Sequence, residues 1–130
     1  MTTPQPRKPL ATLECVVLDC PDPGELAAFY SSLLGGSINQ PDPRWAAGDG
    51  WATLHTPTGP VMAFQAVDRY VAPRWPDPAH PQQFHLDFHV EELERAHSSV
   101  LALGGRLLES AKAWRTYADP AGHPFCLVGN

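Results

Sequence analysis

Residues 82–90 read Gln-Gln-Phe-His-Leu-Asp-Phe-His-Val, and from His85 onward polar and apolar side chains alternate strictly. Side chains of a β-strand point to opposite faces with a period of two residues, so His85, Asp87 and His89 share one face and three apolar residues share the other. An apolar strand face normally packs on a helix. The stretch therefore predicts a strand whose polar face points to solvent or to an internal cavity.

The N-terminal part of the chain predicts a strand followed by an amphipathic helix. Residues 12–20 read Thr-Leu-Glu-Cys-Val-Val-Leu-Asp-Cys, which is typical of a buried strand. In the helix, Asp22 can cap the N-terminus, Pro23 suits the first position and Glu25 can complete a capping box. The pair Gly35-Gly36 is expected to end the helix with a positive φ. The expected buried stripe consists of Leu26, Phe29, Tyr30 and Leu33.

Short strands fill the rest of each half. In the first half they are expected at residues 37–40, 44–47, 51–56 and 61–67, with turns at 48–50 and 57–60. Four prolines in residues 71–81 exclude a regular element there, so this segment is the expected linker. The second half repeats the order of the first. Its strand at His85 is followed by a helix within 91–103, with Leu93, Ala96, Val100 and Leu103 as the buried stripe, and by strands at 106–110, 113–118 and 124–128.

The two halves can be superimposed by matching Cys15 with His85. The same shift pairs Asp19 with His89 and Tyr30 with Val100. Two helix-backed sheets of matching topology are expected to pack together and to curve their other faces around a shared cleft.

We therefore predict an α+β fold in one domain that covers residues 10–130. Its two modules are expected at residues 12–67 and 83–130, with the linker at 71–81. Residues 1–9 are rich in proline and polar residues, and we expect a disordered tail there.

Composition and charge narrow the classes of partner. With 43% hydrophobic and 18% charged residues, the chain has the composition of an ordinary globular protein. The net charge of −5 and the scattered Lys and Arg residues argue against nucleic acid or an anionic membrane surface as partners. No apolar run is long enough to span a bilayer. Three cysteines without a disulfide spacing favour a reduced, cytoplasmic setting.

Four stretches together resemble the vicinal oxygen chelate superfamily, and more narrowly its glyoxalase-like domain branch. These stretches are Leu18–Gly35, His85–Val90, Leu103–Gly105 and Asp119–Leu127. The resemblance implies paired βαβββ modules, a cupped mixed or antiparallel sheet with a helix behind each half, and often a homodimer. The superfamily includes glyoxalase I, extradiol dioxygenases, fosfomycin-modifying enzymes, epimerases and metal-free proteins that sequester bleomycin-type antibiotics. The fold alone therefore does not choose between an enzyme and a binding protein.

The resemblance also implies where metal ligands would lie. Enzymes of the superfamily place them on the first and last strands of each half, and the matching positions here are Cys15, Gln65, His85 and Cys126. Only His85 has the usual ligand type, and Cys126 stands where a Glu is usual. Cys15 and Cys126 could complete a zinc site with His85, or they could be small buried hydrophobic residues. A divalent metal is therefore left open as a cofactor but is not favoured.

The preferred interpretation is a small-molecule-binding protein whose cleft lacks the usual full set of metal ligands. The alternative is a metal-dependent lyase, isomerase or dioxygenase anchored on His85, and a third reading is a pure interaction or dimerisation module. Asp87 can orient His85, bind a ligand or act as a general base, and tryptophans beside the cleft can stack on a flat ligand. The candidate ligand-binding residues are His85, Asp87, Asp19, Gln65, Trp45 and Trp51.

Overall fold

The structure is a computed structural model, and it describes residues 10, 13–41, 48, 50–81 and 85–129. The expected tail at 1–9, the expected strand at 44–47, which includes Trp45, and the first three residues of the 82–90 stretch lie outside the described residues.

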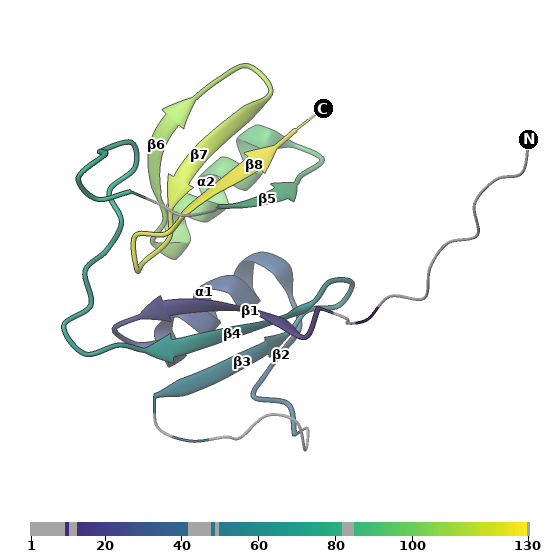
Figure 1. Ribbon diagram of the computed structural model, residues 1–130. Coiled ribbons are helices and arrows are strands. Elements are labelled where there is room, and N and C mark those ends of the chain that lie inside the picture. The colour runs from purple at the N-terminus through teal and green to yellow at the C-terminus, as the bar shows by residue number, and fades with distance from the viewer. Residues whose placement is uncertain (1–9, 11–12, 42–47, 49, 82–84, 130) are drawn as a thin grey trace, which may run out of the picture.

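The described chain forms two modules with the same order of elements (Figure 1). The first module contains β1 (Cys15–Cys20), α1 (Pro23–Leu34), β2 (Ser37–Ile38), β3 (Trp51–His55) and β4 (Val61–Ala66). The second contains β5 (Leu86–His89), α2 (Leu93–Leu103), β6 (Arg106–Ser110), β7 (Trp114–Ala118) and β8 (Pro124–Val128). Between the modules, residues 71–81 form no helix or strand.

Each module carries a four-stranded mixed sheet. The strand orders are β1-β4-β3-β2 and β5-β8-β7-β6, so the two sheets have matching topology. The first and last strands of each module, β1 with β4 and β5 with β8, pair in parallel, and the other pairs are antiparallel. This arrangement confirms the predicted α+β fold of paired βαβββ modules.

Local sequence signals set the ends of the helices. The Asp22 side chain accepts a hydrogen bond from the Glu25 backbone N–H at 3.1 Å, so α1 begins with the predicted cap. Gly35 follows the last residue of α1 with φ +78°, and Gly104 follows α2 with φ +106°. Both helices end where a residue without a Cβ relieves the strain of the left-handed region. None of the described helices is long and apolar enough to cross a membrane.

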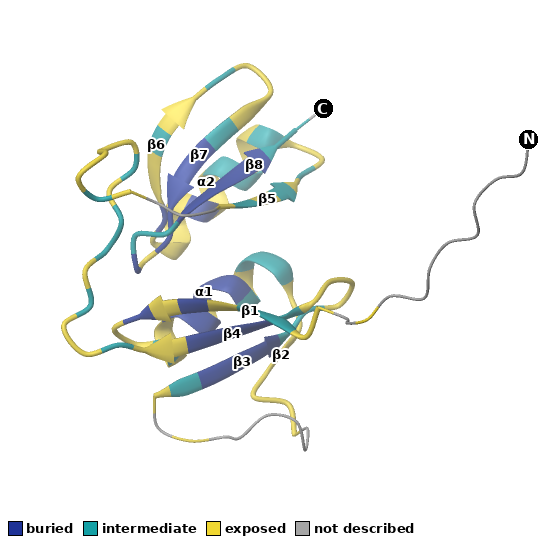
Figure 2. Cartoon of the chain, in the orientation of Figure 1, coloured by how far each residue is buried: buried dark blue, intermediate teal, exposed yellow. Residues whose placement is uncertain are grey.

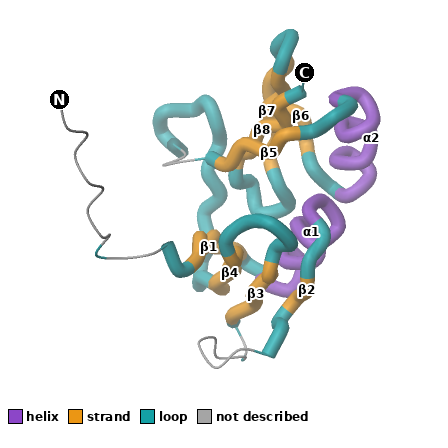
Figure 3. The backbone as a smooth tube through the Cα atoms, turned by 90° about the vertical axis from the view of Figure 1, so that its right-hand side faces the viewer, coloured by secondary structure: helices purple, strands orange, loops and turns teal. Residues whose placement is uncertain are grey.

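Helix α1 forms the centre of the core because it contacts both modules. The Tyr30 ring stacks on Phe64 of β4, with 5.8 Å between centroids, and lies 6.2 Å from both Phe88 of β5 and Phe125 of β8. Phe29 lies 5.8 Å from Phe125 as well. Figure 2 shows buried residues concentrated on α1 and on the inner strands of both sheets, and Figure 3 shows both helices on one side of the molecule.

Helix α2 is less deeply buried than α1. Val100 is its only buried residue, and Leu103, which was expected in the buried stripe, is exposed. The reason is the packing of the two helices: α2 contacts β6, β8 and α1, whereas α1 packs on its own sheet and also meets the aromatic rings of the second sheet. The periodic spacing predicted the helix correctly but overestimated how much of it is covered.

Candidate functional site

Three of the candidate ligand-binding residues lie in one row across the first sheet. Asp19 of β1 pairs with Gln65 of β4, and Gln65 pairs with Trp51 of β3. Paired residues of neighbouring strands share a face, so these three side chains lie on the face opposite α1. Leu18 and Cys20, which flank Asp19 in β1, are buried on the helix side.

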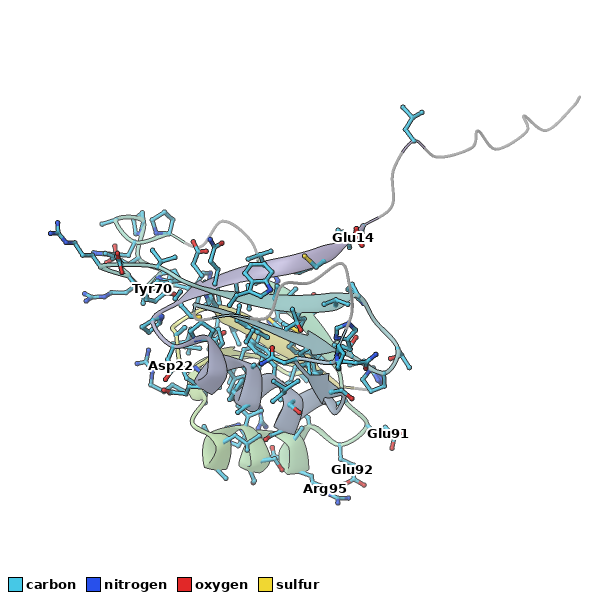
Figure 4. All side chains as sticks on the ribbon, turned by 90° about the horizontal axis from the view of Figure 1, so that it is seen from below. Glu14, Asp22, Tyr70, Glu91, Glu92 and Arg95 are labelled. Carbon is cyan, nitrogen blue, oxygen red and sulfur yellow. The ribbon has the colours of Figure 1, made fainter. Side chains whose placement is uncertain are left out.

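A pocket of about 600 Å³ lies at the end of this row. Asp19 and Gln65 form part of its wall, and the segment after β4 and the turn before β8 form the rest. Its polar lining is completed by Tyr70, His80 and His123, and its apolar lining includes Val17, Val71, Pro73 and Pro81. In Figure 4 Tyr70 lies at one end of the first sheet, and Glu14 lies at the opposite end. The volume lies in the range typical of sites for small organic molecules.

Hydrogen bonds from His123 hold the two modules together at this pocket. Its Nε2 lies 2.6 Å from the backbone oxygen of Asp19 and 3.3 Å from the Tyr70 hydroxyl. Because a carbonyl oxygen can only accept, Nε2 of His123 carries a proton and donates this hydrogen bond. The Tyr70 hydroxyl donates to the backbone oxygen of Ala121 at 2.8 Å. The pocket wall is therefore fixed from both modules.

A buried carboxyl group fixes the turn that carries His123. Oδ1 of Asp119 accepts hydrogen bonds from the backbone N–H groups of Ala121 and His123, at 2.8 and 3.0 Å. Its Oδ2 accepts a 2.6 Å hydrogen bond from the Tyr30 hydroxyl of the first module. Burial raises the pKa of Asp119, and these hydrogen bonds act in the opposite direction. Burial and the nearby Asp119 carboxylate also raise the pKa of Tyr30 well above its usual value.

The linker has its own hydrogen bonds at the pocket rim. The backbone N–H of Arg74 donates to the His80 oxygen at 2.7 Å, and the His80 N–H donates to the Asp77 oxygen at 3.0 Å. The Asp77 carboxylate also accepts from the Ala79 N–H, and this is the main reason why the pKa of Asp77 is lowered. These turns hold Ala79 and His80 against the pocket in spite of the many prolines.

A second group of candidates gathers on the other sheet. Asp87 of β5 is the direct neighbour of Cys126 in the parallel pair of β5 and β8, and His85 precedes Asp87 by two residues on the same face. His85 Nε2 lies 3.2 Å from Asp87 Oδ1. One possible ligand atom from each of His85, Asp87 and Cys126 lies within 4.8 Å of the other two. The His85 and Asp87 side chains are 42% and 60% exposed, whereas Cys126 is buried.

The chemistry of these three donors fits a transition-metal ion. The 3.2 Å distance from His85 to Asp87 is close to the edge, about 3.3 Å, of a tetrahedron with metal–ligand bonds of about 2.0–2.1 Å. Thr116 Oγ1 lies 3.3 Å from Cys126 Sγ and can hold the sulfur in place. Burial raises the pKa of the Cys126 thiol, the hydrogen bond with Thr116 lowers it, and the Asp87 carboxylate raises it. A bound metal would deprotonate the thiol in spite of this shift.

The structure thus places the described candidate residues either in the row across the first sheet or in the cluster on the second sheet, and it leaves Cys15 outside both. Cys15 lies opposite Val61 at the end of β1 away from Asp19, and it does not belong to the His85 cluster of the described residues. His85 lines a small hollow of about 10 Å³ beside His123 and not the large pocket.

Sequence reasoning missed three polar residues of the pocket. Tyr70, His80 and His123 all lie in segments without regular structure, where no periodicity marks a face. The only signal was the position of His123, which directly precedes the closing strand.

Comparison with known proteins agrees with this architecture. The family described as "Glyoxalase-like domain" matches residues 15–128, and the chain belongs to this family. No curated protein matches the sequence significantly.

Solved structures of similar fold cover nearly the whole chain. A glyoxalase/bleomycin resistance protein/dioxygenase family enzyme from Burkholderia phytofirmans is 16% identical, with a TM-score of 0.71 over 92% of this chain and 98% of its own. A glyoxalase-related enzyme from Fulvimarina pelagi is 22% identical, with a TM-score of 0.64 and coverage of 93% and 89%. The fosfomycin resistance protein FosX from Listeria monocytogenes is 16% identical, with a TM-score of 0.67 and coverage of 93% for both chains. At these identities the likeness establishes the fold, which is that of the vicinal oxygen chelate superfamily.

Proposed function

We propose that the protein binds a small organic molecule in the 600 Å³ pocket at the end of the Asp19–Gln65 row. The observation that carries the proposal is the pocket itself, because residues from both modules and from the linker converge on one hollow with a largely apolar wall. The few polar groups, Asp19, Gln65, Tyr70 and His123, are suited to fix the orientation of a ligand.

The polar groups of the pocket favour a ligand that donates hydrogen bonds. The Asp19 carboxylate only accepts, and no Lys or Arg side chain is among the described residues of the wall. The potential metal cluster found among the described residues lies outside the residues that line this pocket.

The test is a fragment screen by two-dimensional ¹H–¹⁵N NMR, with small aromatic fragments in cationic, neutral and anionic sets. Shifts are expected at the amides of Asp19, Gln65, Tyr70 and His123, and cationic or neutral donors should bind better than anionic fragments. Asp19→Asn should weaken a cationic hit by up to about tenfold, which corresponds to about 1.4 kcal/mol.

Glu92→Gln is the matched control for charge. Glu92 is exposed at the start of α2 and its side chain makes no capping hydrogen bond (Figure 4). This variant should bind the same fragments unchanged. Shifts confined to residues outside the pocket, or equal losses in both variants, would exclude the proposal.

A metal-dependent enzyme is the second candidate, and the His85–Asp87–Cys126 cluster favours it. A variant of Listeria monocytogenes FosX, one of the proteins with this fold, is known in complex with Mn(II) and a dihydroxypropylphosphonic acid. A metal on this cluster would supply Lewis-acid chemistry at its open position. His85 and Asp87 are exposed enough to meet a substrate. If His85→Ala left metal content and turnover unchanged, this candidate would be excluded.

We also propose that the protein is a cytoplasmic homodimer. The three cysteines are free, as expected in a reducing compartment, and Trp114 and Leu107 expose apolar surface on the second sheet. Light scattering coupled to size exclusion will measure the mass. A monomeric mass at all concentrations would exclude the dimer.

A further inference from the structure

We propose a second binding site, for a small uncharged apolar molecule, in a hollow of about 320 Å³ that both modules line. We call it the apolar hollow. None of the described residues lines both this hollow and the large pocket at Asp19. The inference therefore goes beyond the proposed function and does not depend on it.

The apolar hollow lies on the helix side of the sheets, whereas the large pocket lies on the opposite side. Val16 of β1 and Met62 of β4 are cross-strand partners and therefore share a face. Val16 also shares this face with the buried Leu18 and Cys20, which pack toward the helices. The hollow is thus separated from the row of Asp19, Gln65 and Trp51 by the first sheet itself.

Four apolar side chains at the hollow are covered only in part. Val16, Leu34 at the end of α1, and Leu86 and Phe88 of β5 pack against the core but stay half-buried, whereas the adjoining Met62 is 4% exposed. Removing apolar surface from water is favourable in proportion to the area removed. Partly covered groups from two modules that meet at one hollow therefore favour a molecule that covers them together.

The turn at residues 56–60 closes the hollow and offers few hydrogen-bonding groups. The Thr56 hydroxyl donates to the Pro60 oxygen and accepts from the Gly59 N–H, both at 3.0 Å, so its capacity is used within the turn. Pro57 and Pro60 have no backbone N–H. A ligand with many polar groups would lose its hydrogen bonds to water here without gaining others.

The charges of the lining also disfavour an ionic ligand. Asp87 is the one charged residue among the described residues of the lining, and its carboxylate lies 3.2 Å from His85. The alternation of β5 turns this pair away from Leu86 and Phe88, so no charge faces the apolar side chains. Apolar cavities bind hydrocarbons in preference to ordered water. The volume is near the lower end of the range for ligand sites, about 300–1,000 Å³, so the ligand is small.

The test uses the full chain with ¹³C-labelled Met, Leu and Val methyl groups, titrated with toluene, benzoate and benzylammonium. These three probes share one ring and differ in charge. Toluene should shift the methyl signals of Met62 and Leu86 until they saturate. The two charged probes should shift the same signals with at least about tenfold lower affinity, because their charges would have to leave water.

Leu34→Trp should fill the hollow and weaken toluene binding at Met62 at least about tenfold. Leu101→Trp is the matched control, because Leu101 is an exposed leucine of α2 outside the hollow, and toluene binding should be unchanged in it. If Leu34→Trp does not fold, Thr58→Trp places the same side chain at an exposed position of the turn and should weaken binding likewise.

Four results would overturn the proposal. They are the absence of saturable shifts at Met62 and Leu86, equal affinity for toluene and benzoate, and equal losses in Leu34→Trp and Leu101→Trp. The fourth is a set of methyl shifts that follow protein concentration and not toluene, which would show that a second copy of the chain covers the hollow. Binding at the large pocket is read separately, from the amides of Asp19 and Gln65 with benzylammonium, so either proposal can fail without the other.

Discussion

Replacing Tyr30 by Phe tests the hydrogen bond that joins the two modules in the core. The Tyr30 hydroxyl of α1 donates to Asp119 Oδ2 at 2.6 Å, 89 residues further along the chain, and both groups are buried. Tyr30→Phe keeps the ring and its stacking on Phe64, so the change isolates the hydroxyl.

The expected loss of folding stability follows from the buried groups that remain when the Tyr30 hydroxyl is removed. Asp119 keeps its two backbone donors, but Oδ2 becomes a buried acceptor without the Tyr30 donor. Loss of a hydrogen bond to a charged or strongly polar buried group costs about 1–3 kcal/mol. With a urea m-value of about 2 kcal/mol/M, a loss of about 2 kcal/mol lowers the midpoint of unfolding by about 1 M.

Tyr70→Phe is the matched control for Tyr30→Phe. The Tyr70 hydroxyl donates to a backbone carbonyl in a half-buried position, where a neutral hydrogen bond contributes about 0.5–1.5 kcal/mol. Urea unfolding followed by circular dichroism at neutral pH measures both variants. A loss below about 0.5 kcal/mol for Tyr30→Phe, or one no larger than for Tyr70→Phe, would refute the central role of this bond.

Three further predictions concern other parts of the fold. Gly36→Ala should destabilise the protein by at least about 2 kcal/mol in the same urea assay, because φ is +98° and the added Cβ would overlap a backbone carbonyl of β3. Gly48→Ala meets nothing within 4 Å, and an equal loss there would contradict this reasoning. Because burial raises the pKa of Asp119, its contribution to folding is greatest below the unfolded pKa of about 3.9 and declines as the pH rises. The stability of the native chain relative to Asp119→Asn should therefore fall as the pH rises above about 4, by at most about 1.4 kcal/mol per pH unit, and a rise would be contrary evidence. Cys20 is fully buried and its thiol pKa is raised to about 11. Mass spectrometry should therefore find Cys20 alkylated far more slowly than Cys15 in the folded protein. Equal alkylation rates of the two thiols would show that β1 opens at Cys20.

The sequence predicted the fold well because its signals are local. The alternation in β5, the Asp22 cap and the glycines after both helices each depend on a few neighbouring residues. The match of Tyr30 with Val100 was equally informative, since both are fully buried at equivalent places in their helices.

The candidate sites were less predictable because they depend on pairing between distant segments. Asp87 and Cys126 were identified separately, but only the register of the parallel pair of β5 and β8 makes them neighbours. The contact of His123 with the Asp19 carbonyl depends on the shape of a turn that the buried Asp119 holds. No periodic pattern in the sequence encodes either relation.

The position of α1 has a consequence for biosynthesis. Its rings Phe29 and Tyr30 are covered partly by Phe88 and Phe125, which leave the ribosome much later than the helix itself. A nascent first module therefore has to keep this aromatic face in water, or shielded by a chaperone, until the closing strand β8 has been made. Phe29 and Tyr30 therefore gain the part of their cover that Phe125 supplies only after β8 has been translated.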